Sequence, residues 1–159
     1  MPLRQFLADC SALGDRRGPL LVQLPPSLAF DRRVARTFFD LLRREHGGPV
    51  ACEPRHPTWF SAVADALLVD YRVARVAADP ACVPAAAIPG GWPGLVYYRL
   101  HGSPRTYWSA YEDDALDRIA ADVRAFHGRR DDADVWCIFD NTAGGAAAGN
   151  ALAVLAKLR

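Results

Sequence analysis

The stretch V-A-C-E-P-R-H-P-T-W at residues 50–59 is the most informative part of the chain. A short apolar run ends in Glu53, and Pro54 ends the predicted strand because proline has no backbone N–H to donate to a sheet ladder. A cation, an imidazole and an indole follow directly, in Arg55, His56 and Trp59. Groups of four different chemistries are therefore crowded at the carboxyl end of one predicted strand.

Four further apolar runs also turn polar at their ends. Together with residues 49–53 they predict strands at 20–24, 73–78, 95–100 and 134–139. Apolar residues at helical spacing and nearby end signals predict helices at 2–13, 31–46, 57–68, 112–127 and 143–157. This alternation indicates an α/β fold in which helices flank a parallel sheet. In such folds ligands bind at the carboxyl ends of the strands.

The helix predicted at 31–46 carries clear start and stop signals. Asp31 is a suitable N-cap, and Gly47 and Gly48 end the helix. Its predicted apolar stripe consists of Val34, Phe38, Leu41 and Leu42. The Pro- and Ala-rich segment 80–93, in contrast, has no predicted element, and loops of this length are typical of functional or capping segments.

Length and composition fit one globular domain spanning residues 1–159. Hydrophobic residues make up 51% and charged residues 23%, as in soluble proteins. Nineteen Lys and Arg against 18 Asp and Glu leave a net charge of +1, so no strong field attracts nucleic acid or an anionic membrane. No apolar run approaches the ~18 residues of a membrane helix, and the N-terminus lacks the apolar core of a signal peptide. We therefore expect a cytoplasmic protein.

The four cysteines have no metal-binding or redox spacing. They are Cys10, Cys52, Cys82 and Cys137, and none lies in a CxxC pair. We predict buried free thiols in preference to a zinc site or a disulfide. No cofactor motif is present, because the chain lacks a P-loop, a Rossmann fingerprint and a nucleophile elbow.

Glu53 is the leading catalytic candidate. Strand alternation places it on the face of Ala51, which is the inner face if Val50 and Cys52 face the helices. A carboxylate at a strand end can act as a general base or a metal ligand. The alternative is a structural ion pair with an arginine.

Arg99 and His101 share a strand face with Tyr97. A guanidinium beside an imidazole suits an anionic group such as a carboxylate or phosphate, so we assign anion binding to Arg99 and proton transfer to His101. The alternative is an arginine that neutralises Glu53 beside a capping histidine. Arg55 and His56 lie in the loop beyond their strand and are further candidates for ligand binding.

Other candidates close the remaining strands. Asp79 and Asp140 can bind ligand or cap the segment that follows. Together with histidines and Glu53 they can also form an oxygen and nitrogen metal site, but no spacing motif supports a metal. Asn141 leads a small-residue turn into the last helix, where backbone N–H groups favour an anion. Small residues at such a turn also allow close helix packing.

The loop after strand 95–100 holds three aromatic residues. They are Tyr107, Trp108 and Tyr111. All three are candidates for stacking on a ring or sugar of a ligand, with Tyr107 as the predicted ligand-binding residue, and packing over the sheet is the alternative.

Several segments together resemble one protein family. They are G-P-L-L-V-Q-L-P-P-S (18–27), E-P-R-H-P-T-W (53–59), the aspartate closing 73–79, Y-Y-R-L-H-G (97–102), and I-F-D-N-T (138–142) with Asn150 downstream. In this order they resemble the YecE-like family, also called domain of unknown function 72. The resemblance implies a TIM-barrel fold. It also implies that this chain corresponds to the C-terminal part of the barrel, about five of its eight βα units.

An incomplete barrel leaves two sheet edges open. The resemblance implies that strands 20–24 and 134–139 each lack one neighbour, and both are apolar on both faces. Three alternatives follow. The edges pair with another chain, or the sheet is open and covered by helices, or the chain is a fragment. Because native proteins rarely expose apolar edges, we predict self-association, most simply as a two-fold dimer.

These patterns support two functional hypotheses. The first is an enzyme acting on a small anionic or sugar-like substrate, with Glu53 and His101 in proton transfer and Arg55 and Arg99 binding charge. The second is a non-catalytic binding or interaction module, or a remnant without activity. The chemistry of the resembling family is itself unassigned.

Overall fold

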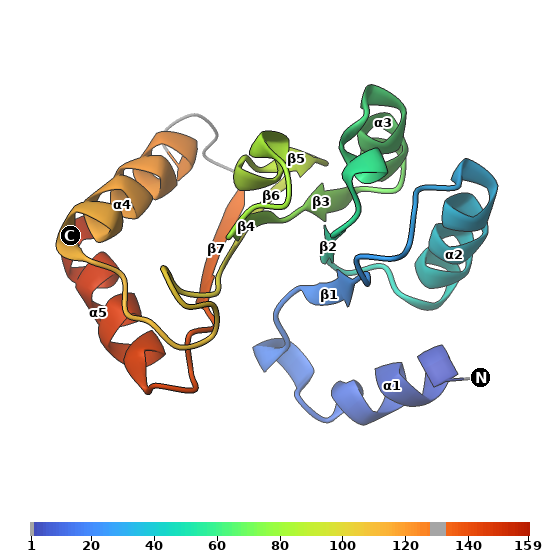
Figure 1. Cartoon of the computed structure of the whole chain (residues 1–159). Helices are drawn as coiled ribbons and strands as arrows, with labels where there is room; N and C mark the ends of the chain where they lie inside the picture. The colour runs from blue at the N-terminus through green and yellow to red at the C-terminus, as the bar shows by residue number, and fades with distance from the viewer. Residues whose placement is uncertain (1, 128–132) are drawn as a thin grey trace.

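An arc of mainly parallel strands forms the centre of the computed structural model, which describes residues 2–127 and 133–159 (Figure 1). Its main strands are β1 (Leu20–Gln23), β2 (Val50–Glu53), β3 (Val73–Arg75), β4 (Ala77–Asp79), β6 (Leu95–Leu100) and β7 (Asp134–Phe139). The order is β1-β2-β3 in one sheet and β4-β6-β7 in the next, and all four pairings are parallel. The α/β prediction with a parallel sheet is therefore confirmed.

One predicted strand, at 73–78, is shared between the two sheets. β3 pairs with β2, whereas β4 pairs with β6. Val76 lies between β3 and β4, and its N–H donates to the carbonyl of Cys52 at 2.9 Å. The chain therefore changes partners in mid-strand, and this change carries the arc from one sheet into the other.

Helices lie around the strands (Figure 1). They are α1 (Pro2–Ser11), α2 (Arg32–Glu45), α3 (Ala62–Asp70), α4 (Asp113–His127) and α5 (Ala146–Leu158). The helix predicted at 57–68 is divided, because η2 (Pro57–Phe60) is a 3-10 turn and the Ser61 side chain then caps α3. The segment 80–93 is not without structure, since it holds η3 (Pro84–Ala87) and the short antiparallel strand β5 (Gly90–Gly91). A further 3-10 turn, η1 (Gly14–Arg16), follows α1.

Two apolar cores pack the helices against the outer face of the arc. One joins β1, β2 and β3 to α2 and α3, and the other joins β4, β6 and β7 to α4 and α5. The stripe predicted for α2 is partly wrong, because Val34 and Phe38 are exposed. Ala35, Phe39 and Leu42 are the buried residues instead, since they follow each other at four and three residues and so share one helix face.

A third core lies on the inner face of the arc. Ala51, Ala74, Leu95 and Tyr97 belong to it. Val50 and Cys52, in contrast, belong to the outer core. The predicted alternation along 50–53 is therefore observed, and Glu53 lies on the inner side with Ala51.

The two ends of the arc remain unpaired within the described part of the chain. β1 pairs only with β2, and β7 pairs only with β6. Trp136 on β7 nevertheless reaches the segment before β1, because a Cβ at Gly18 would lie 2.7 Å from its indole. The two ends are thus in contact through one side chain, without a strand ladder.

The prediction of buried thiols is fully met only by Cys52. All four cysteines are free, but Cys82 is exposed, and Cys10 and Cys137 are half-buried. Cys82 lies in the irregular segment after β4, where no neighbouring strand covers it. No helix in the described residues is long and apolar enough to cross a membrane.

Candidate functional site

Strand alternation gathers polar side chains at the carboxyl ends of β1, β2, β6 and β7. The inner positions of these strands run into a glutamine, a glutamate, an arginine, a histidine and an aspartate. They are Gln23, Glu53, Arg99, His101 and Asp140. Because carboxyl ends of parallel strands meet at one edge, residues more than a hundred positions apart form a single cluster.

Glu53 is the centre of this cluster and is only 2% exposed. Its Oε1 accepts a hydrogen bond from Arg55 Nε at 3.0 Å. Its Oε2 accepts from Arg99 Nη1, and Nε2 of His101 lies 3.5 Å from Oε1. Both oxygens of the buried carboxylate therefore face positive or polar groups.

The pKa of Glu53 reflects two opposed effects. Burial alone raises it, because an ionised carboxylate loses its hydration. The contacts from His101, Arg99 and Arg55 outweigh burial and lower the pKa to about 2. Glu53 is thus ionised at neutral pH and is a weak base. A strongly perturbed acid beside a cavity is also a physical marker of a functional site.

Arg99 links its own strand, β6, to three other strands. Its Nη1 donates to Glu53 and also to Gln23 Oε1, at 2.6 Å for the second contact. Its Nη2 donates to Asp140 Oδ2 at 2.5 Å. One guanidinium therefore pairs with two carboxylates and links β1, β2 and the end of β7 to β6.

His101 lies between the same two carboxylates. Its Nδ1 is 3.2 Å from Asp140 Oδ2, and its Nε2 faces Glu53. The Nε2 atom is buried and has no hydrogen bond with any described residue. The imidazole is therefore held by Asp140 on one side and faces the Glu53 carboxylate on the other.

Tyr107 covers one side of the cluster. Arg55 Nη2 donates to its hydroxyl at 3.2 Å, and its ring meets His101 edge-on with 5.1 Å between ring centroids. Its backbone has φ of 65°, a left-handed conformation that is costly for a bulky residue. Strain of this kind occurs at ligand sites, where the surrounding structure holds it in place.

Two other predicted site residues lie outside this cluster. Asp79 accepts a hydrogen bond from the Tyr111 hydroxyl at 2.6 Å, and that hydroxyl accepts from the Gly102 N–H at 2.9 Å. His56 faces Thr58 and caps η2. Their partners fix the start of the loop after β6 and the turn after β2.

Asn141 is fully buried below the loop 102–111. Its Nδ2 donates to the Ser109 carbonyl at 2.9 Å and to Asn150 Oδ1 at 2.8 Å. The same Asn150 oxygen accepts from the Tyr111 N–H at 3.1 Å. This amide network fixes the loop that carries Tyr107. Asn141 therefore holds the site in shape without lining it.

Two residues of these networks were not predicted from the sequence, and a third was predicted in another role. Gln23 follows the inner alternation of β1, so the same period-two pattern that identified Glu53 can find it. Ser109 contributes only a backbone carbonyl, which no sequence pattern marks. Tyr111 was predicted as a stacking residue, but its hydroxyl joins Asp79 to the backbone of Gly102.

A cavity of about 320 Å³ opens beside the cluster. Glu53, Arg55 and His101 line it on one side, and small or apolar residues of the segment after β4 line the other, including Cys82. Its volume is at the lower end of the roughly 300–1,000 Å³ of small-molecule sites. Within the described residues no group of three or more His, Cys, Asp or Glu side chains can hold a metal ion.

Taken together, these features define an α/β protein with a charged cluster and a small cavity at the carboxyl ends of a parallel strand arc. The chain belongs to the family described as "Protein of unknown function DUF72", whose model matches residues 1–159. None of the curated proteins matches this chain.

Solved structures of family members share the fold. Two crystal structures of a DUF72 family protein from Enterococcus faecalis V583 superpose with TM-scores of 0.79 and 0.78, at 19% and 22% identity. A DUF72 family protein from Thermotoga maritima MSB8 gives a TM-score of 0.77 at 24% identity. Each comparison covers 98% of this chain, but 64%, 67% and 64% of the Enterococcus chains and the Thermotoga chain respectively.

Proposed function

We propose that this protein binds a small polar molecule in the cavity beside Glu53 and exchanges protons with it through His101. One observation carries the proposal, namely that Asp140, His101, Glu53 and Arg99 lie side by side in this order at the edge of an open cavity, each within 3.5 Å of the next. Asp140 and Glu53 orient the imidazole. Because Glu53 stays ionised, it stabilises a proton on His101 better than it accepts one from a substrate.

The charges of the cluster favour a sugar-like or singly charged ligand. Glu53 and Asp140 together offset the charges of Arg55 and Arg99, so a multiply charged anion has to displace a carboxylate first. Arg55 Nη1 has no hydrogen-bond partner among the described residues and can donate to a hydroxyl or carboxylate of the ligand. The exposed ring of Tyr107 supplies a flat apolar surface next to it.

The exposed thiol of Cys82 allows binding to be tested without knowing the reaction. We expect iodoacetamide to alkylate Cys82 first, because Cys82 is exposed, Cys10 is half-buried, Cys52 is buried, and burial raises the pKa of Cys137 to about 12. A panel of monosaccharides and small carboxylates is then screened for protection of Cys82, read by mass spectrometry. If no compound of either class protects Cys82, the cavity is not a site for them.

Turnover is tested on the compounds that protect Cys82. The variant His101→Gln is expected to abolish proton transfer, seen as loss of substrate-proton exchange with D₂O by NMR. His56→Gln is the matched control, since His56 lies outside the cluster and should leave the exchange unchanged. Equal exchange rates in both variants would exclude His101 as the proton donor.

A non-catalytic binding module is the second candidate. It is favoured by the saturation of Glu53, whose two oxygens are both occupied by arginine side chains. In that case compounds still protect Cys82, but no exchange or turnover is detected in the unmodified protein. The same two experiments therefore distinguish the candidates.

We further propose that the arc belongs to a YecE-like TIM barrel and that its open edges mediate self-association. The unpaired outer edges of β1 and β7 support both ideas, since a barrel strand has two neighbours. Light scattering over a hundredfold concentration range tests the assembly, and a two-fold dimer is expected. A strict monomer at the highest concentration would exclude it.

A further inference from the structure

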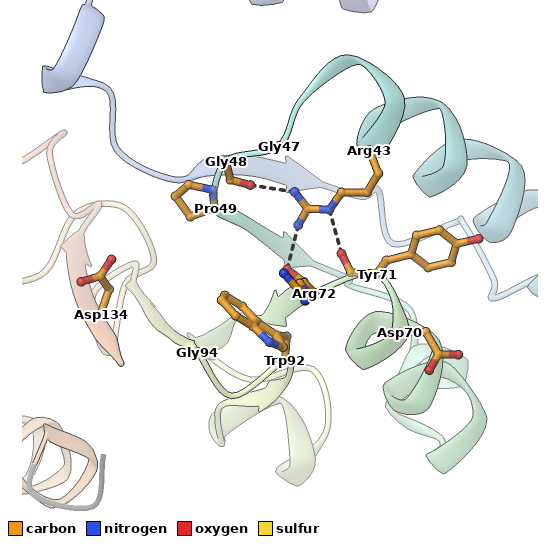
Figure 2. A pocket seen from close by; sticks show the side chains of 10 residues that line it. All are labelled: Arg43, Gly47, Gly48, Pro49, Asp70, Tyr71, Arg72, Trp92, Gly94 and Asp134. Atoms are coloured by element: carbon orange, nitrogen blue, oxygen red, sulfur yellow. Dashed lines mark hydrogen bonds between the residues drawn. The ribbon is translucent and has the colours of Figure 1, made fainter. Parts of the chain in front are cut away.

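A second cavity lies at the opposite, amino-terminal ends of the strands (Figure 2). Its volume is about 590 Å³. It is lined by the segments that lead into β2, β3 and β6 and by the first residue of β7, so no residue of the Glu53 cluster contributes to it. Two arginines, Arg43 and Arg72, belong to its lining.

Arg43 is half-buried, and its partners among the described residues are all backbone carbonyls. Its Nε donates to Tyr71 at 2.7 Å, its Nη1 to Gly48 at 2.7 Å, and its Nη2 to Arg72 at 2.7 Å (Figure 2). A weaker contact of 3.4 Å joins Nη1 to the His46 carbonyl. These acceptors are neutral, so they satisfy the geometry of the guanidinium but not its charge.

Arg72 adds a second positive charge at the same place. Its side chain is exposed and has no hydrogen bond or ion pair with any described residue. Its backbone has φ of 52°, an uncommon value for an L-residue other than asparagine or aspartate. Burial and the nearby charge of Arg72 both lower the pKa of Arg43, because each disfavours its protonated form.

No carboxylate offsets this pair within the described residues. Asp134 lies across the cavity from Arg43, and Asp70 points away from both arginines in Figure 2. Neither aspartate lies within ion-pair distance of Arg43 or Arg72. A half-buried cation without a counter-ion is costly, and an anion in the cavity would remove that cost.

An indole forms another wall of the cavity. Trp92 lines it and packs partly against the inner core of the arc. Its ring lies directly over Gly94, where a Cβ would collide with it. Glycine at this position therefore leaves room for the indole, which offers a surface to a ring of the ligand.

We propose that this cavity is a second ligand site, which takes an oxyanion, either phosphate or carboxylate, attached to a flat ring. The oxyanion binds Arg72 and the remaining Nη2 hydrogen of Arg43, and the ring lies against Trp92. Hydrogen-bond donors on the far side of the ring face Asp134. The site is independent of the Glu53 cluster, which lies at the other ends of the strands.

Isothermal titration calorimetry at low salt tests the proposal with phenyl phosphate, inorganic phosphate and phenol as probes. We expect phenyl phosphate to bind more tightly than inorganic phosphate, and phenol to bind least. In Arg72→Gln, which removes the charge and keeps a polar side chain, phenyl phosphate should bind about tenfold more weakly or worse. Binding that does not change in Arg72→Gln, or no binding at all to the unmodified protein, would overturn the site.

Two matched variants locate the effect. Arg33→Gln removes an exposed charge elsewhere on α2 and should leave the affinity within about twofold. An equal loss in Arg33→Gln would mean non-specific attraction only. A loss in Arg55→Gln but not in Arg72→Gln would place the anion at the Glu53 cluster instead. Equal affinities for phenyl phosphate and inorganic phosphate would exclude the role of Trp92.

Discussion

The arginines at the two ends of the strand arc have different kinds of partner. At the carboxyl ends, Glu53 and Asp140 hold Arg99 in direct ion pairs, and His101 lies between the same carboxylates. At the amino-terminal ends, Arg43 is surrounded by neutral carbonyls and repelled by a neighbouring arginine. In the part of the chain that the structure describes, the charges at one end are paired, whereas no carboxylate pairs with the arginines at the other.

This difference has a simple structural origin. The carboxyl-end cluster is built from inner strand positions, where acids and bases from different strands meet at fixed spacing. The amino-terminal cavity is built from a helix end and the turns before strands, which supply backbone carbonyls. The charged groups of the first arrangement therefore pair with one another, and the second is suited to accept a ligand that brings negative charge.

The largest expected effect is the loss of Glu53. We expect Glu53→Ala to lower the free energy of unfolding by roughly 3–5 kcal/mol, because Arg99 is left without its buried partner. Urea denaturation followed by circular dichroism measures the change. Asp134→Ala, at the opposite end, should change stability by no more than about 0.5 kcal/mol. Similar losses in both variants would contradict the comparison.

The free energy of unfolding should depend on pH through Glu53 of the same cluster. The folded pKa of Glu53, about 2, is below its ordinary value of 4.5, so its contribution is fully present above pH 4.5. It is lost as the pH falls from 4.5 through 2, by an amount on the order of 3 kcal/mol. Urea titrations between pH 7 and pH 2 measure it. Glu53→Gln should flatten this part of the curve, and an unchanged curve would argue against the lowered pKa.

An intermediate effect is expected at Tyr111. Removal of its hydroxyl in Tyr111→Phe leaves the Gly102 N–H and Asp79 without this partner, at a cost of about 1–3 kcal/mol. Hydrogen exchange should show faster exchange of the Gly102 amide as well. Tyr71→Phe is the control, since the Tyr71 hydroxyl bonds to Asp40 at the surface and its removal should change stability little.

The smallest expected effect is at Arg72. Arg72→Gln should leave the free energy of unfolding within about 0.5 kcal/mol or raise it slightly, because it removes a repulsion from Arg43. Thermal denaturation at low and high salt measures the change. The difference in stability between Arg72→Gln and the unmodified protein should be smaller at high salt. A clear destabilisation would mean that Arg72 has a structural partner.

Much of the carboxyl-end cluster follows from the sequence alone. A period of two along each strand determines which residues face inward, and polar residues at strand ends must then meet at one edge. This reasoning identified Glu53, Arg99, His101 and Asp140, and it can also find Gln23. The same local patterns determined the order of helices and strands.

Only the tertiary structure decided how these groups pair. Asp79 was predicted in the site but faces Tyr111, because it shares the outer parity of Ala77 in a strand that changes partners at Val76. The exposed Val34 of α2 shows the same limit, since helical spacing does not say which of two adjacent stripes meets the sheet.

The amino-terminal cavity had no signal in the sequence. Arg43 was part of an ordinary helix end, and its partners are backbone carbonyls as much as 29 positions away. Backbone carbonyls are present at every residue, so no side-chain pattern reveals which of them converge. Side-chain chemistry and spacing are thus written in the sequence, whereas the convergence of distant backbone groups around a charge exists only once the chain has folded.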